Sequence, residues 1–237
     1  MPKLFQESWF HADLSAPGQT AELSEEEAFH LGKVLRIRAG ERIVVTNGMG
    51  TALLCDTEAQ GNRITVTAVE VLRETPLPPR IHMVLALLKG RDIEMPVEAL
   101  CELPIAAVHL VSSDHTQAYK AQDHAKLVER LRSKSLVALK QAKKTWLTRI
   151  HAPVPLGLWR STHSGALILV HPGPDRLELP GSGDLFVLIG PEGGFSSREL
   201  QSLEDGKCFN LGLGETRIRG IHAPLLACGK LMGLGLI

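Results

Sequence analysis

The sequence predicts a small β-rich module followed by an α/β domain whose sheet is mostly parallel. Up to about residue 72, short runs rich in β-branched residues are separated by turn signals, as in a strand-rich module. After about residue 80, apolar runs of strand length alternate with helical segments, the order typical of a parallel sheet. Between them, Thr75–Pro79 has the composition of a stiff linker. We therefore expect domains over residues 1–73 and 80–237.

In the first module we expect one short helix and several strands. Ser24 is a suitable N-cap because Glu27 follows three residues later, and this pair predicts a helix from Ser24 to Leu35. The predicted strands cover residues 42–47, 51–56 and 63–72, with glycines at the turn between the first two.

In the second part, strands and helices are expected to alternate. The predicted strands cover residues 81–88, 106–111, 167–170, 185–189 and 208–213. The predicted helices cover residues 92–103, about 118–144, a segment that begins at Ser196 with Glu199 three residues on, and the apolar C-terminal run 225–237. Lys230 interrupts that last run, which is shorter than the roughly 20 residues that span a bilayer. A packed helix is expected there, either within the chain or at a subunit interface.

Composition narrows the possible functions. The formal net charge is zero, whereas nucleic-acid-binding proteins usually carry a basic excess. Bases nevertheless gather at residues 33–42 and 120–149, which fits either RNA-contacting surfaces or solvated helix faces. Aromatic residues make up only 4% of the chain, so base stacking is not expected to be the main source of RNA affinity.

The cysteines and the N-terminus bear on the compartment. Cys55, Cys101, Cys208 and Cys228 are far apart and show no paired spacing, so we expect reduced residues in place of a metal site or a disulfide framework. The N-terminus lacks the apolar core of a signal peptide. We expect a cytoplasmic protein that binds no membrane and no metal.

The most informative segment is Leu185–Phe195, an apolar run that ends in Gly-Pro-Glu-Gly-Gly-Phe. This pattern predicts a buried strand, a glycine-rich loop and then the helix that begins at Ser196. Neither phosphate-binding glycine motif matches, because no Gly-Lys-Ser/Thr ends the loop and the order is Gly-x-x-Gly-Gly. The loop carries Glu192 and no Lys, so we expect a neutral or cationic ligand.

Three segments are predicted at the ends of successive late strands. They are His171-Pro-Gly173, Ile189–Gly194, and Leu211–Gly214 with Arg217 and Arg219 behind it. Parallel sheets place ligands at the carboxyl edge of their strands, and three glycine-containing loops in a row favour a composite pocket over three ordinary turns.

These segments resemble the RsmE-type 16S ribosomal RNA uridine-N3 methyltransferases of the SPOUT group. The similarity covers nearly the whole chain. It rests on Leu188–Ser196 with Glu199 and Leu213-Gly214, on His30-Leu-Gly-Lys-Val-Leu-Arg-Ile-Arg38 with Gly40, on Leu87-Leu-Lys-Gly-Arg91 with Glu94 and Glu102-Leu103, and on Gln141-Ala-Lys-Lys144.

The resemblance implies a PUA-like β-barrel that binds RNA, followed by a SPOUT-type α/β domain with a C-terminal trefoil knot. It also implies S-adenosylmethionine as cofactor, a uridine N3 of 16S ribosomal RNA or the small subunit as substrate, and a homodimer. The glycine loop agrees with that cofactor, which carries a sulfonium cation and no phosphate.

One segment departs from the family pattern. Gly220, Ile221 and His222 replace Thr, Glu and Thr when Leu213-Gly214 is aligned with the family's Leu-Gly, which makes Arg219 the key base. Alignment from Leu211 makes it Arg217 instead. Because the altered segment is the one expected to meet the nucleotide, an alternative is a divergent member that binds cofactor and RNA with weak or no methyl transfer, or that methylates another RNA.

The candidate residues follow from these segments. Arg219 or Arg217 is the candidate for stabilising charge on the uridine ring, although either could instead hold a phosphate or a helix end. His222 is a candidate base or a helix-start residue. The candidate cofactor residues are Leu169, His171, Ile189, Gly190, Pro191, Glu192, Gly193, Gly194, Leu211, Leu213, Gly214 and Ile218. The candidate RNA-contacting residues are Lys33, Arg36, Arg38, Lys89, Arg91, Lys140, Lys143 and Lys144.

Overall fold

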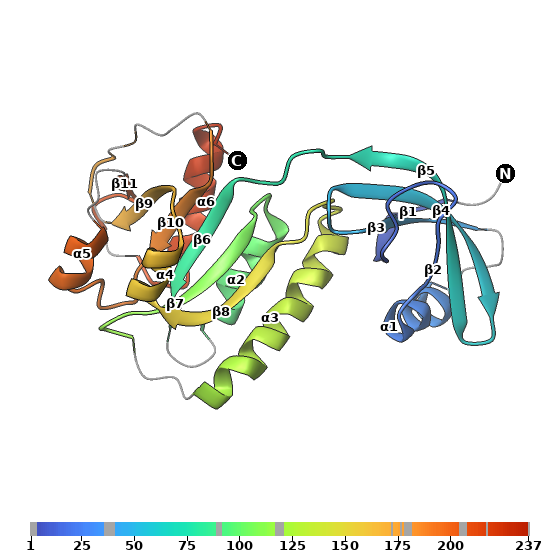
Figure 1. Cartoon of the computed structure of the whole chain (residues 1–237), viewed down its shortest axis with the longest axis horizontal. Helices are drawn as coiled ribbons and strands as arrows, with labels where there is room; N and C mark the ends of the chain where they lie inside the picture. Colours follow the sequence, from blue (N-terminus) through green and yellow to red (C-terminus); the bar gives the residue numbers. More distant parts are fainter. Residues whose placement is uncertain are drawn as a thin grey trace. The chain divides into compact units, whose positions relative to one another are not determined.

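The computed structural model describes residues 4–35, 41–88, 92–116, 121–171, 173–175, 177, 182–203, 208–216 and 218–236. The chain forms two compact units, residues 1–78 with 136–147 and residues 79–135 with 148–237 (Figure 1). Residues 136–147 were expected in the second domain, but they belong to the first unit. Their backbone explains this, because Gly50 N donates to Thr145 O at 2.8 Å and Leu147 N donates to Gly48 O at 2.9 Å.

The first unit is built on a five-stranded sheet in the order β1-β3-β4-β5-β2. Its strands are β1 (Leu4–His11), β2 (Thr20–Glu22), β3 (Arg42–Thr46), β4 (Thr51–Gln60) and β5 (Arg63–Glu74). β1 runs parallel to β3, and the other neighbours are antiparallel. The predicted strands at 42–47, 51–56 and 63–72 are present, the second of them longer than expected, whereas β1 and β2 were not predicted.

A helical segment follows β2 and closes the core of this unit. It consists of α1 (Glu25–Phe29) and a π-helical turn, η1 (His30–Val34). Ser24 caps it as predicted, since its Oγ accepts a hydrogen bond from Glu27 N at 3.3 Å. The helix expected over Ser24–Leu35 is thus present, but its second half has the wider π geometry. Leu31 of that turn is fully buried with Ile43 and Leu53 of the sheet.

The second unit contains a six-stranded sheet in the order β11-β9-β10-β6-β7-β8, and every described neighbour pair is parallel. The strands are β6 (Ile81–Ala86), β7 (Ala107–Ser112), β8 (Arg149–Pro155), β9 (Ala166–His171), β10 (Leu185–Ile189) and β11 (Cys208–Gly212). This confirms the predicted parallel α/β domain. β8 was not predicted because it contains Pro153 and Pro155, which an edge strand tolerates.

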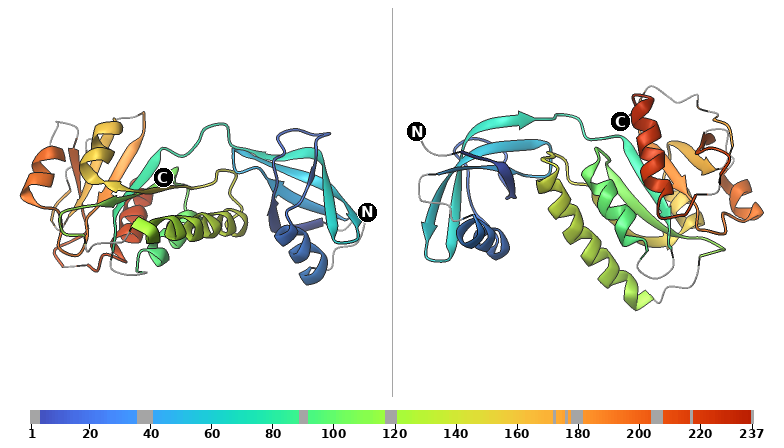
Figure 2. Two further views of the ribbon diagram at one scale, coloured as in Figure 1. Left: turned by 60° about the horizontal axis from the view of Figure 1, so that its bottom comes forward. Right: turned by 180° about the vertical axis from the view of Figure 1, so that it is seen from behind.

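Helices cover both faces of this sheet (Figure 2). They are α2 (Glu94–Glu102), α3 (Ala121–Gln141), α4 (Leu156–Thr162), α5 (Ser197–Leu203) and α6 (Ala223–Gly233). Trp159 of α4 and Leu203 of α5 share a core cluster with Val84 of β6. Its neighbour Met83 points to the opposite face, where its Sδ lies 3.6 Å from Cys228 Sγ of α6. α4 was not predicted, and Gly157 inside it weakens the helical signal.

Three histidines from the neighbouring strands β6, β7 and β8 lie side by side in the second unit; His82 and His109 are buried, and His151 is exposed. His82 Nδ1 and His109 Nε2 lie 3.1 Å apart, and the rings of His109 and His151 stack with centroids 4.2 Å apart. Burial is the main cause that lowers the pKa of all three, for His109 to about 3. All three are therefore held neutral at physiological pH.

In the described ranges, no helix is both long and apolar enough to cross a membrane. The part of the chain that the structure describes also contains no group of three or more His, Cys, Asp and Glu placed to hold a metal ion. The trefoil knot that the resemblance implies stays a prediction, since residues 178–181 between β9 and β10 and residues 204–207 between α5 and β11 lie outside the described ranges.

Candidate active site

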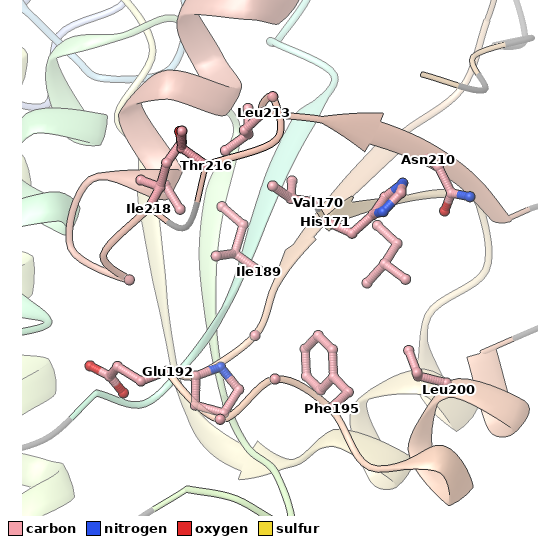
Figure 3. Close-up of a pocket in the computed structure, with 18 residues that line it drawn as sticks. Val170, His171, Ile189, Glu192, Phe195, Leu200, Asn210, Leu213, Thr216 and Ile218 are labelled. Atoms are coloured by element: carbon pink, nitrogen blue, oxygen red, sulfur yellow. The ribbon is translucent and has the colours of Figure 1, made fainter. Parts of the chain in front are cut away.

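A pocket of about 570 Å³ opens where β9, β10 and β11 end (Figure 3). Because these strands are parallel neighbours, their carboxyl ends lie at one edge of the sheet. The volume of the pocket is that of an ordinary small-molecule site. The residues that line it are Leu169, Val170, His171, Ile189, Gly190, Pro191, Glu192, Gly193, Gly194, Phe195, Leu200, Asn210, Leu213, Gly214, Thr216, Ile218, Gly220 and Ala223.

The glycine loop after β10 forms one wall of the pocket, and two of its glycines are sterically required. Gly194 has φ +71°, in the left-handed region, and its N donates to Pro191 O at 2.9 Å to close a tight turn. A Cβ on Gly190 would lie 3.0 Å from the ring of Phe195, closer than nearly all real contacts. The sequence therefore sets the loop's shape through backbone positions that other residues would disturb.

Glu199 of α5 and residues after β7 hold this loop in place. Glu199 is only 8% exposed, and its carboxylate accepts hydrogen bonds from Ser196 N at 2.8 Å and Asp114 N at 2.9 Å. His115 Nδ1 lies 3.0 Å from Gly194 O, and a Cβ on Gly193 would lie 3.2 Å from His115 Cβ. The capping box predicted from Ser196 and Glu199 is thus present, and its glutamate also ties the loop to β7.

Asp114 adds a charged connection at the same place. It accepts hydrogen bonds from Ser196 Oγ at 2.6 Å and Arg198 Nη2 at 2.8 Å. The Ser196 hydrogen bond, with Arg198 next, holds the pKa of Asp114 below its usual range. The glycine loop and the start of α5 are therefore fixed by groups from another strand end.

The opposite wall is formed where the segments after β9 and β11 meet. Leu213 N donates to His171 O at 3.3 Å, and Gly173 N donates to Gly214 O at 3.3 Å. A Cβ on Gly212 would lie 1.7 Å from Gly173 O, so only glycine fits there. The two predicted strand-end segments thus pair with each other beside the pocket.

The chemistry of the pocket is mostly apolar. Among its described lining residues, none is Lys or Arg, and Glu192 is the one acid. In Figure 3 the Glu192 carboxylate points away from Phe195 and Leu200. His171 Nε2 is buried and has no hydrogen-bond partner among the described residues. This composition does not suit a phosphate, and it suits an apolar or cationic ligand that contacts backbone groups.

All but one of the candidate cofactor residues line this pocket. The exception is Leu211, which lies within β11 and is fully buried. Leu213 and Gly214 line the pocket in its place. Sequence reasoning missed Val170, Phe195, Leu200, Asn210, Thr216, Gly220 and Ala223. Phe195 directly follows the glycine motif and could have been found from that position.

Of the candidate catalytic residues, the structure describes Arg219, which lies beside the pocket. Arg219 is exposed and does not line it, although Ile218 and Gly220 on either side do. The Arg219 carbonyl accepts hydrogen bonds from His222 N at 2.9 Å and Ala223 N at 3.2 Å, which starts α6. His222 occupies the N-cap of α6, but its side chain makes no cap hydrogen bond. Arg217 lies outside the described residues.

The candidate RNA-contacting residues are only partly described. Lys33 and Lys143 are exposed, and Lys144 is half-buried. Lys140 forms an ion pair with the buried carboxylate of Glu27, and an RNA contact by Lys140 stays a prediction. Arg36, Arg38, Lys89 and Arg91 lie outside the described residues.

Comparison with known proteins identifies related sequences along most of the chain. Residues 74–232 match the RNA methyltransferase domain family, and residues 23–69 match the RNA methyltransferase PUA domain. The Ribosomal RNA small subunit methyltransferase E of Mycobacterium bovis is 29% identical over 238 residues, which cover 93% of this chain and 89% of that protein. The Ribosomal RNA small subunit methyltransferase E of Synechocystis is 27% identical, and the match covers 91% of this chain and 73% of that protein.

Solved structures show the same fold. A methyltransferase from Legionella pneumophila, in complex with S-adenosylmethionine, superposes with a TM-score of 0.82 at 25% identity, covering 95% of this chain and 97% of that one. The Ribosomal RNA small subunit methyltransferase E of Neisseria gonorrhoeae superposes with a TM-score of 0.81 at 21% identity, covering 96% and 97%. Because the methyltransferase family matches residues 74–232, with its PUA domain before it, this chain belongs to the RNA methyltransferase family.

Proposed function

We propose that this protein transfers the methyl group of S-adenosylmethionine to N3 of a uridine in small-subunit (16S) ribosomal RNA. The observation that carries the proposal is the pocket at the ends of β9, β10 and β11. Relatives named for small-subunit ribosomal RNA methylation match most of this chain, and the Legionella structure holds S-adenosylmethionine.

The lining residues fit this cofactor. S-adenosylmethionine supplies a methyl group bonded to a sulfonium cation and carries no phosphate. A pocket whose described lining has no Lys or Arg avoids repelling that cation. Gly190 and Gly193 line the pocket and carry no side chain that would cover their backbone N–H and C=O groups, so these groups can meet an adenine edge. Ile189, Leu213 and Ile218 supply apolar surface for its ring.

Arg219 is the residue we assign to the nucleotide side of the reaction. Uridine N3 must lose its proton to attack a methyl carbon, and negative charge then spreads onto the ring oxygens. A guanidinium beside those oxygens stabilises that charge. Arg219 is exposed, and its neighbours in sequence line the pocket, so its side chain is available to a nucleotide at the rim.

The first unit is proposed to hold RNA, in keeping with its match to the PUA domain. Lys33 and Lys143 are the exposed cations that support this. Such contacts would position the RNA by its phosphates, and binding should therefore weaken steeply with salt.

We also propose that the protein is a homodimer. Leu226 and Met232 of α6 and Leu234 after it are 48%, 46% and 52% exposed. A second copy that covered these apolar side chains would remove them from water. Light scattering coupled to size exclusion measures the mass directly, and a monomer at micromolar concentration would refute this part of the proposal.

Methyl transfer is tested with labelled S-adenosylmethionine and small ribosomal subunits that lack the modification. Wild-type protein should transfer label, and Arg219→Ala should lose most of the rate while keeping cofactor affinity. Arg219→Lys is the matched variant, since it keeps a cation at the rim and should retain more activity. Cofactor binding with no transfer by wild-type protein would refute the proposed reaction and favour a binding role.

A further inference from the structure

Just beyond the pocket, two charged side chains bind both backbone groups of one residue. Asp175 Oδ1 accepts a hydrogen bond from Gly212 N at 2.9 Å, and Lys230 Nζ donates to Gly212 O at 2.7 Å. Lys230 Nζ also donates to Asp175 Oδ1 at 2.8 Å and lies 2.7 Å from Oδ2. We call these three residues the Gly212 clasp. It joins the segment after β9, the end of β11 and the helix α6.

The clasp occupies the open edge of the sheet. β11 is the outermost strand, with β9 as its one neighbour. Leu213 N is bonded to His171 O on the β9 side, and successive residues of a strand direct their backbone groups to opposite sides. The N–H and C=O of Gly212 therefore point away from β9, to a side where none of the described strands pairs with β11. Asp175 and Lys230 supply the acceptor and the donor that a further strand would have supplied.

The residue held in this way determines where one pocket wall lies. Leu213 and Gly214, which follow Gly212, line the pocket, whereas Asp175 and Lys230 do not. Gly212 also packs so closely on Gly173 that a Cβ would lie 1.7 Å from Gly173 O. A shift of Gly212 would thus displace both Leu213 and the segment after β9.

We propose that Asp175 and Lys230 are positioning residues that hold Leu213 and Gly214 in the shape that binds the methyl donor. They act through the backbone of Gly212, without touching the ligand themselves. The inference rests on the proposed function, because it names residues that govern cofactor affinity at the same site. It also explains Lys230, the single charge within the apolar C-terminal run.

The test removes each partner and then exchanges them. In Asp175→Ala and Lys230→Met, S-adenosylmethionine should bind roughly tenfold more weakly by calorimetry, the size expected from losing a hydrogen bond to a charged group. Hydrogen exchange of the backbone amides over 212–214 should be faster in the absence of ligand. Lys230→Arg keeps a donor and a positive charge, and should bind within about threefold of wild type.

The exchanged variant, Asp175→Lys with Lys230→Asp, separates positioning from simple ion pairing. It restores an ion pair, but it brings an ammonium to the Gly212 N–H and a carboxylate to the Gly212 C=O. Affinity should therefore stay low. Lys134→Met is the matched control, because it breaks a surface pair with Glu98 in the same unit and should leave affinity and amide exchange unchanged.

The proposal is overturned if the single variants keep wild-type affinity and amide exchange, or if the exchanged variant recovers wild-type affinity. Failure of the proposed function would give another result: wild-type protein itself would not bind S-adenosylmethionine. In that case, amide exchange over 212–214 still decides whether the clasp holds the wall. Unchanged exchange in both single variants would refute it.

Discussion

Replacement of Glu199 by Gln should loosen the glycine loop and destabilise the second unit. The Glu199 carboxylate is 8% exposed and accepts hydrogen bonds from two backbone amides, one on each oxygen. A glutamine has one acceptor oxygen, so its NH₂ group would face one of those N–H groups. Loss of one hydrogen bond to a buried charged group, with an N–H left unsatisfied, costs about 2–3 kcal/mol. The loosened glycine loop should also weaken S-adenosylmethionine binding.

Urea unfolding measures this loss, and calorimetry measures the cofactor affinity. Glu98→Gln is the matched control, since Glu98 is half-exposed and pairs with Lys134 at the surface. Glu98→Gln should lower the free energy of unfolding by no more than about 0.5 kcal/mol. If Glu199→Gln stays within about 0.5 kcal/mol of wild type and binds the cofactor equally well, the carboxylate does not hold the loop and the reasoning is wrong.

Three further predictions address other parts of the molecule. The pKa of His109 is lowered from 6.5 to about 3 in the folded state. Its contribution to stability is therefore present above about pH 6.5 and is lost on acidification. Between about pH 6.5 and pH 3, the free energy of unfolding should fall by about 1.4 kcal/mol per pH unit. In His109→Phe, the free energy of unfolding measured with urea should depend less steeply on pH than in wild type, and an unchanged pH dependence would contradict this. Gly193→Val should abolish cofactor binding in calorimetry because a Cβ there already meets a side chain at 3.2 Å, whereas Gly157→Ala has open space and should bind normally. Lys140→Met should lower the free energy of unfolding by about 3 kcal/mol, because it leaves the buried Glu27 carboxylate without this partner. A loss of RNA affinity in filter binding without a loss of stability would show instead that Lys140 contacts RNA.

Local patterns predicted much of the site. Ser196 and Glu199 are three residues apart, so their mutual capping could be recognised from spacing alone. The glycine loop could be placed because it follows an apolar run of strand length, and a parallel sheet brings such loops to one edge.

Long-range contacts account for what the sequence did not predict. The ion pair of Lys140 was not predicted, because its partner Glu27 is 113 residues away in the sequence. The Gly212 clasp joins Asp175 to Lys230 across 55 residues, and no periodicity links such positions. Leu211 was grouped with the pocket because it belongs to a Leu-Gly pair, yet its side chain is fully buried and does not line the pocket. Only tertiary structure distinguishes Leu211 from Leu213.

The most direct test of the account is to identify the methylated nucleoside. Small subunits that lack the modification are incubated with the protein and labelled S-adenosylmethionine, the ribosomal RNA is digested, and the nucleosides are separated by mass spectrometry. We predict labelled 3-methyluridine from wild-type protein and its absence with Gly193→Val. Label on another nucleoside, or none although the cofactor binds, would contradict it.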